Sequence, residues 1–167
     1  FGPTTAVEPY RLYSVVQPPI ANAATETEPN DVPASADSFG GNYFRGAVSS
    51  GTHTDVYSFS AQAGDLVFLG MDCDADRDGT AVNGTLALLA SDGAGVLLTV
   101  NGSGTTQTPA PSPGTGLTAS TPAFAGEGLV YRIRTAGTYY AKITGVPGGS
   151  AASQDYALSI STNCAIP

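Results

Sequence analysis

Carboxylates gather in two short segments of this 167-residue chain, and closely spaced carboxylates are the side chains that bind hard metal cations. The first segment is marked by four oxygen-bearing side chains: Glu26, Glu28, Asn30 and Asp31. The second is marked by four aspartates: Asp72, Asp74, Asp76 and Asp78. Calcium takes roughly six to eight oxygen ligands, so each segment is a candidate part of a calcium site.

The first segment, residues 26–31, reads E-T-E-P-N-D. In an extended chain alternate residues project to one side, so Glu26 and Glu28 point the same way. The Pro-Asn-Asp turn that follows folds the chain back and adds further oxygens. Composition alone leaves a second interpretation open, in which this segment is a solvated acidic linker.

The second segment contains D-x-D-x-D-G from Asp74 to Gly79, which is the first half of an EF-hand-like loop. The twelfth loop position is Thr85 instead of the bidentate glutamate, so an EF-hand is excluded. A calcium loop between two strands remains open. The alternative is a polar turn whose carboxylates repel one another until a cation neutralises them.

Enzymatic chemistry has little support in the sequence. His53 is the only histidine, its neighbourhood is typical of a hairpin turn, and no G-x-S-x-G nucleophile motif occurs. Zinc sites of the Cys/His type are excluded by the residue counts. Paired carboxylates can hydrolyse glycosides, but these acids lie in turns beside Asn and Gly and not along a cleft. We therefore expect a protein that is not an enzyme.

The charge balance restricts the partners. Fourteen acidic residues against six basic ones give a net charge of −8, so nucleic acid and anionic membranes are poor partners. No apolar run reaches the length of a membrane span. Cys73 and Cys164 are the only cysteines, and such a pair favours an oxidising compartment. We expect a secreted protein with a Cys73–Cys164 disulfide, the alternative being two buried free thiols.

The composition predicts an all-β protein, because 21 glycines and 12 prolines separate short runs of apolar residues. Eight such runs predict strands, at residues 43–48, 56–60, 66–71, 85–89, 96–100, 129–134, 138–144 and 156–161. Eight strands suit a sandwich of two sheets. Residues 101–126 are rich in Gly, Ser, Thr and Pro and predict a long surface loop.

Alternation within these strands predicts the side chains that face the core: Tyr57, Phe59, Leu86, Leu88, Leu129, Tyr131, Ile133, Tyr139, Ala141, Ile143, Tyr156, Leu158 and Ile160. Arg132, Arg134 and Lys142 are then expected on the outside. Residues 66–69 are continuously apolar, as in a central strand that is covered on both faces.

Two longer segments resemble a known family. Residues 26–31 match its E-x-E-P-N-D entry, and residues 55–65 read D-V-Y-S-F-S-A-Q-A-G-D, with Gly46 between them. Residues 136–143 and 156–160 follow in the same order and spacing. Over roughly residues 25–162 the chain resembles the bacterial pre-peptidase C-terminal domain family, which includes collagen-binding domains of bacterial collagenases.

The resemblance implies a jelly-roll-like antiparallel β-sandwich with calcium between residues 26–31 and the turn before Asp55. The ligands that it implies are Glu26, Glu28, Asn30, Asp31 and Asp55. One departure is visible, because His53 stands where many relatives carry an acid. The loop from Asp72 to Asp78 resembles an acidic insertion of some members. The sandwich is expected over residues 25–164.

Residues 1–24 precede the resemblance as an N-terminal extension. Four prolines flank a strand-like segment at residues 10–17, whose apolar positions are Tyr10, Leu12, Val15 and Val16. We expect this strand to add to a sheet edge, either its own or that of a neighbouring copy. Head-to-tail addition between copies does not close, and it produces a filament.

These observations predict a secreted, calcium-stabilised structural domain that assembles into an extracellular filament or surface layer through its N-terminal strand. The alternative is an accessory module of a secreted peptidase that binds collagen, another protein or a polysaccharide. In that alternative, exposed aromatic residues such as Tyr140 make the contacts.

Overall fold

The computed structural model describes residues 22–40, 43–49, 52–75, 82–101, 116–120, 126–145 and 154–163. The predicted N-terminal strand at residues 10–17 lies outside these ranges, as do Asp76, Asp78 and Cys164. Within the described residues, no helix has the length and apolar character needed to cross a membrane.

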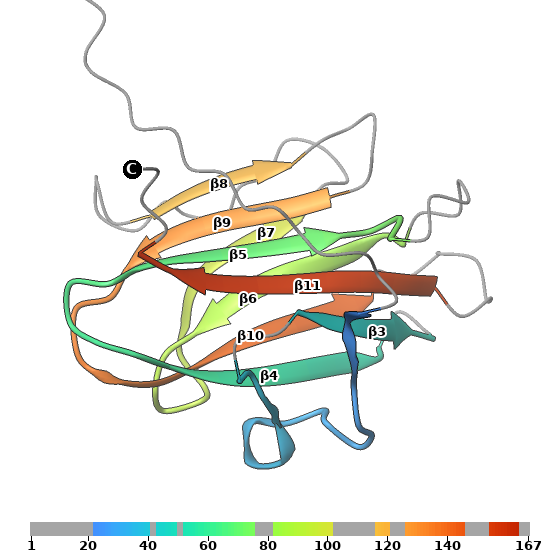
Figure 1. Ribbon diagram of the computed structural model, residues 1–167, viewed down its shortest axis with the longest axis horizontal. Coiled ribbons are helices and arrows are strands. Elements are labelled where there is room, and N and C mark those ends of the chain that lie inside the picture. The colour runs from blue at the N-terminus through green and yellow to red at the C-terminus, as the bar shows by residue number, and fades with distance from the viewer. Residues whose placement is uncertain are drawn as a thin grey trace, which may run out of the picture.

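Two sheets pack face to face (Figure 1). The first has six strands, in the order β1 (Ala24–Thr25), β3 (Phe44–Val48), β11 (Gln154–Thr162), β5 (Leu66–Asp72), β9 (Gly126–Arg132) and β8 (Gly116–Ser120). The second has five, in the order β2 (Asp37–Ser38), β4 (Thr54–Ala61), β10 (Gly137–Gly145), β6 (Gly84–Leu89) and β7 (Val96–Asn101). A short 3-10 helix, η2 (Pro33–Ser35), precedes β2.

The predicted all-β sandwich is confirmed, and each of the eight predicted strands is present. Neighbouring strands are antiparallel except for two short pairs at the sheet edges, β1 with β3 and β2 with β4, which are parallel. Three strands were not predicted. β1 and β2 have two residues each, too few to show an alternation, and β8 lies in the Gly- and Thr-rich stretch that was expected to be a loop.

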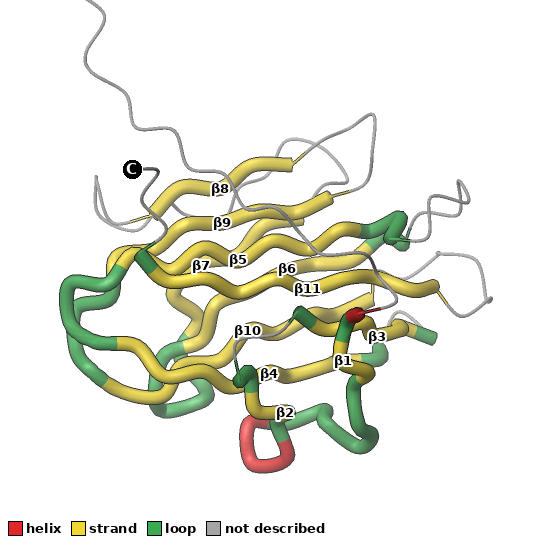
Figure 2. Tube along the Cα trace, viewed as in Figure 1, coloured by secondary structure: helices red, strands yellow, loops and turns green. Residues whose placement is uncertain are grey.

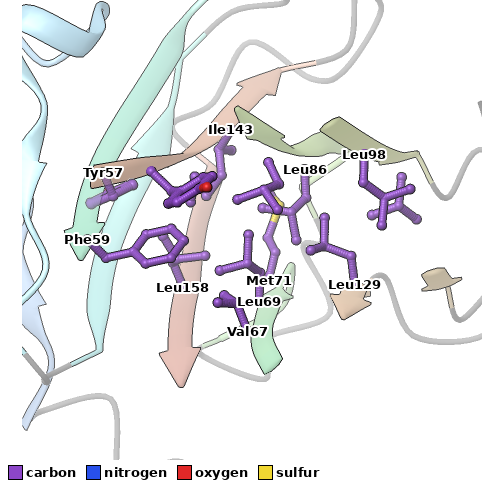
Figure 3. Packing of buried hydrophobic residues seen from close by; sticks show 14 of the residues in the cluster. Tyr57, Phe59, Val67, Leu69, Met71, Leu86, Leu98, Leu129, Ile143 and Leu158 are labelled. Carbon is purple, nitrogen blue, oxygen red and sulfur yellow. The ribbon is translucent and has the colours of Figure 1, made fainter. Parts of the chain in front are cut away.

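The core fills the space between the two inner faces (Figure 3). Tyr57, Leu86, Leu88, Ile143 and Leu158 have no measurable exposure. Every side chain that alternation predicted to face inward is buried except Ile160, which is partly buried against the cluster. Period-two alternation therefore located the core, because one face of each sheet is apolar.

One expectation about β5 is wrong. The strand is central in its sheet, between β11 and β9, but only alternate residues face the core. Val67 and Leu69 are buried, whereas Leu66 and Phe68 are half-buried on the outer face. In a two-layer sandwich a second layer covers only one face of each sheet, so a continuous apolar run did not indicate burial on both sides.

Two connections cross between the sheets at the same side of the sandwich (Figure 2). The entry segment, which we define as residues 26–36, leads from β1 in the first sheet to β2 in the second. The turn after β3 leads from the first sheet to β4 in the second. The backbone N–H of Val56 donates a 3.0 Å hydrogen bond to the carbonyl of Asn30 and joins the two connections.

Candidate metal centre

Three potential metal ligands meet where these two connections touch. Glu28 comes from the entry segment, His53 from the turn before β4, and Asp55 from the second residue of β4. One ligand atom from each lies within 4.8 Å of the others. We call these three residues the Glu28–His53–Asp55 cluster.

Asp55 is the buried member of the cluster, with a side-chain exposure of 0%. Its Oδ2 accepts a 2.5 Å hydrogen bond from the hydroxyl of Tyr156. Its Oδ1 accepts no hydrogen bond and lies 3.4 Å from Nε2 of His53. Burial raises the pKa of Asp55 to about 7, against the opposing effect of the Tyr156 hydrogen bond, and the nearby Glu26 charge raises it further.

His53 lies between the two carboxylates. Its Nε2 is 2.7 Å from Oε1 of Glu28, and its Nδ1 accepts a 3.0 Å hydrogen bond from the backbone N–H of Ser49. Burial alone would lower the pKa of His53, but the hydrogen bond to Glu28 and the charge of Asp55 outweigh it, so the pKa is raised. The negative charges around the imidazole therefore favour its protonated form.

Asn30 is fully buried beside the cluster. Its Nδ2 donates a 3.3 Å hydrogen bond to Oδ2 of Asp37, which also accepts the backbone N–H of Thr27 at 2.8 Å. The other amide atom, Oδ1, has no hydrogen-bond partner. A buried carbonyl oxygen without a donor is costly, and a bound cation would satisfy it.

The carboxylate of Glu26 is already bonded within the protein. Its Oε1 accepts the backbone N–H of Ala47 at 2.8 Å, and its Oε2 accepts the hydroxyl of Tyr57 at 3.0 Å and lies 3.2 Å from that of Tyr156, whose single proton is shared with Asp55. Burial raises the pKa of both tyrosines well above the ordinary value, so both hydroxyls remain protonated donors. Glu26 is thus linked to Asp55 through the Tyr156 hydroxyl and does not belong to the cluster.

Gly46 makes this arrangement sterically feasible. A Cβ at this position would collide with Oε2 of Glu26 and with the hydroxyl of Tyr156. The backbone of β3 can approach the Glu26 carboxylate and the Tyr156 hydroxyl only because residue 46 has no side chain.

The remaining predicted ligands lie elsewhere. Asp31 is exposed and outside the cluster. Asp72 ends β5, and its Oδ1 accepts the backbone N–H of Asp74 at 3.2 Å in a local turn. Because Asp76 and Asp78 lie outside the described residues, a second calcium site in that loop stays a prediction.

Ser49, His53 and Glu28 contain the residue types of a catalytic triad, with Oγ of Ser49 3.3 Å from Nδ1 of His53. The backbone N–H of Ser49 already donates to that nitrogen at 3.0 Å. In this structure the nitrogen lone pair therefore accepts from the backbone and not from the serine hydroxyl, whose proton a general base would have to take.

A divalent cation fits the site, because two buried oxygens lack donors and two carboxylates face each other across the imidazole. The oxygen shell expected for calcium fits less well. Glu26 is already bonded to Ala47 and to the tyrosine hydroxyls, Asp31 is outside the cluster, and the position between Glu28 and Asp55 holds a nitrogen.

The sequence did not reveal the part played by His53, which was noted only as a departure from the family pattern. Its contact with Glu28 spans 25 positions and arises only when the entry segment folds against β4. Tyr57 and Tyr156 were correctly expected in the core, but nothing in the alternation indicated that their hydroxyls hold the buried carboxylates. The sequence carried one signal for this pairing. His53 and Asp55 are two positions apart at the start of a strand, so their side chains project to the same side.

Cys73 is buried in the core, where burial raises the pKa of its thiol to about 12. It is a free thiol in this structure. Its expected partner Cys164 lies outside the described residues, so the disulfide stays a prediction.

Comparison with known proteins gives structural matches only. No family model and no curated protein matches the sequence. The pre-peptidase C-terminal domain of a collagenase from Bacillus anthracis is 16% identical, with a TM-score of 0.48, covering 75% of this chain and 94% of that one. PliG from Aeromonas hydrophila, a periplasmic inhibitor of g-type lysozyme, is 12% identical, with a TM-score of 0.47, covering 77% and 96%. The first carries the name of the family that the sequence resembles.

Proposed function

We propose that this chain is a non-enzymatic β-sandwich module of a secreted protein, in which a divalent cation fastens the entry segment to β4. The observation that carries the proposal is the pair of buried oxygens that accept no hydrogen bond, Oδ1 of Asn30 in the entry segment and Oδ1 of Asp55 at the start of β4. A cation bound there would hold both connections together.

The site suits a structural role better than a chemical one. Asp55 and Asn30 are fully buried and the exposed fraction of the His53 side chain is 19%, so only Glu28, at 45%, is open to a substrate. A cation that binds the folded chain and not the unfolded one raises stability by about 2.7 kcal/mol at roughly a hundred times its dissociation constant.

Thermal unfolding of the purified protein tests this proposal. After treatment with EDTA and dialysis, the melting temperature is measured with and without added calcium, magnesium, manganese or zinc. We expect at least one ion to raise the melting temperature of the wild type and to have no effect on Asp55→Asn. If none of the four ions changes the wild-type melting temperature, the proposal is wrong.

The wider role that we propose is that of a structural subunit, which assembles into an extracellular filament or surface layer through residues 10–17. Support for this part comes from the sequence, since those residues lie outside the described ranges. Electron microscopy of the intact chain and of a chain lacking residues 1–24 tests it. We expect filaments only from the intact chain, and dispersed particles from both at high concentration would contradict the idea.

A second candidate function, binding of an extracellular protein or glycan, is favoured by a pocket of about 380 Å³. It lies between β2, β4 and β10 on one side and β11 on the other, lined by Phe39, Phe59, Ile160 and hydroxyl side chains of Ser and Thr. Tyr140, the contact proposed from the sequence, is not in its lining. Binding of collagen peptides or oligosaccharides that is lost in Phe39→Ala would favour this function over the structural one.

A further inference from the structure

His53 lies between the two carboxylates of the candidate site and provides a nitrogen ligand, whereas calcium sites use oxygen ligands. Nε2 of His53 lies 2.7 Å from Oε1 of Glu28 and 3.4 Å from Oδ1 of Asp55. The three atoms lie within 4.8 Å of one another and come from the entry segment, the turn before β4 and the start of β4. An imidazole is the ligand of zinc, copper, iron and nickel, whereas calcium and magnesium prefer oxygen alone.

A second observation indicates a bound ion. Oδ1 of Asp55 is fully buried, faces the imidazole and accepts no hydrogen bond. Oδ2 of the same carboxylate is occupied by the Tyr156 hydroxyl at 2.5 Å. The carboxylate is therefore held in one orientation, with one oxygen bonded to the core and the other directed into the cluster. This is the arrangement by which a neighbouring hydrogen bond orients a metal-ligating carboxylate.

We propose that the Glu28–His53–Asp55 cluster binds a first-row transition metal ion of the zinc class in preference to calcium. The ligands are Oε1 of Glu28, Nε2 of His53 and Oδ1 of Asp55, and a water or Oδ1 of Asn30 completes the shell. One imidazole and two carboxylates form a ligand set that zinc accepts. The inference rests on the proposed function, because it names the class of ion that fastens the entry segment.

Ser49 supports the histidine in this role. A metal on Nε2 requires the ring proton on Nδ1, and metal-bound histidines donate that proton to a nearby acceptor. Oγ of Ser49 lies 3.3 Å from Nδ1 and can accept it. Ser49 is exposed, so its backbone N–H, which donates to Nδ1 in this structure, can bond to water instead.

Metal titration of the EDTA-treated protein tests the inference. Zinc and calcium affinities are measured by calorimetry, and cobalt is added as a spectroscopic substitute whose visible absorption reports nitrogen ligation. We expect zinc to bind at least about tenfold more tightly than calcium, and cobalt to develop visible absorption bands. His53→Ala should weaken zinc binding by about a hundredfold and remove the cobalt bands, and Ser49→Ala by about tenfold.

Two further variants complete the experiment. His53→Asp supplies a third carboxylate and should reverse the preference toward calcium. Asp31→Asn removes an exposed acid outside the cluster and should leave zinc affinity unchanged. Circular dichroism of each variant shows whether it is folded, and the cobalt spectrum of the wild type remains informative if His53→Ala does not fold.

The results separate this inference from the proposed function. If calcium binds the wild type more tightly than zinc, the ion class proposed here is wrong, but the proposal that a cation joins the entry segment to β4 is still supported. If zinc binds equally well to the wild type and His53→Ala, the cluster is not the site and the inference fails. If neither ion binds nor changes the melting temperature, both proposals fail together.

Discussion

The hydroxyl of Tyr156, on β11 of the six-stranded sheet, donates a 2.5 Å hydrogen bond to Oδ2 of Asp55, on β4 of the five-stranded sheet. The two residues are 101 positions apart, and neither has measurable exposure. Together with the 2.7 Å contact between the hydroxyls of Tyr156 and Tyr57, this hydrogen bond joins the two layers through buried polar groups within a mainly apolar core. A buried charge-assisted hydrogen bond of this kind is short and strong. Removing one of its partners leaves the other buried and unsatisfied, which destabilises the folded state.

Tyr156→Phe removes the hydroxyl that donates to Asp55 and keeps the aromatic ring, so it leaves no large cavity in the core. Asp55 loses the donor to Oδ2, and Glu26 keeps only Ala47 and Tyr57 as donors. We expect the free energy of unfolding to fall by about 1–3 kcal/mol in urea titrations. Tyr140→Phe, on a half-buried tyrosine outside the network, is the matched control and should change stability little. Equal free energies of unfolding for the two variants would show that the Tyr156–Asp55 hydrogen bond does not stabilise the packing of the two sheets.

Gly46→Ala should also disturb the buried carboxylates, although the substitution adds only a methyl group. The new Cβ would occupy the space of Oε2 of Glu26 and the Tyr156 hydroxyl, and overpacking of this kind costs about 1–3 kcal/mol. Gly40→Ala is the control, because a Cβ there meets nothing within 4 Å. Chemical denaturation of both variants measures the difference, and a neutral Gly46→Ala would show that β3 does not need this close approach.

The pH dependence of the cation-free protein follows from Asp55. Its folded pKa of about 7 lies above the value of about 3.9 expected in the unfolded chain, so the folded state binds the proton more tightly. This contribution to stability is complete below about pH 4 and is lost as the pH rises through about 7. The raised pKa of His53 acts in the same direction, above its unfolded value of about 6.5.

In chelator, the free energy of unfolding should therefore decrease from about pH 4 through about pH 7. Asp55→Asn has no carboxyl group at this position, and its stability should depend less on pH over the same interval. Urea unfolding at closely spaced pH values measures both curves. Parallel curves for the variant and the wild type would show that Asp55 does not titrate in this range.

Asp65 predicts the opposite pH dependence, at the far end of β4. Its carboxylate accepts hydrogen bonds of 2.7 Å from Nδ2 of Asn163 and from the backbone N–H of Gln62, and these bonds lower its pKa. The stabilisation is present above the unfolded value of about 3.9 and is lost as the pH falls through the lower folded pKa. Asp65→Asn should be less stable than the wild type at neutral pH, and the difference should vanish in acid. A difference that persists in acid would place its cause outside this carboxylate.

Sequence patterns predicted most of the fold and only part of the site. Strands such as β9 and β10 alternate apolar and polar residues, so both their existence and their inward faces could be predicted. β8 could not, because its five residues, G-L-T-A-S, contain only one large apolar side chain and form a strand through pairing with β9. Local patterns carry no information about such tertiary pairing.

The same limit applies to the site. Glu28 and Asn30 were marked by local carboxylate spacing, and Asp55 by the resemblance. His53 could not be assigned, because its ring meets Glu28 only after two connections between the sheets have come together. The donors to Glu26 were hidden for a related reason. Alternation indicates that Tyr57 and Tyr156 point inward, but not which buried group each hydroxyl reaches.

The two-residue strands β1 and β2 cap corresponding edges of both sheets, and one continuous segment carries both of them. If that segment detaches, the backbone donors and acceptors of β3 and β4 become exposed at the same time. Exposed strand edges are templates for pairing with other chains. If the proposed cation holds this segment in place, its loss would lead to aggregation before global unfolding, and the segment that closes the sandwich would also be the feature that keeps separate molecules apart.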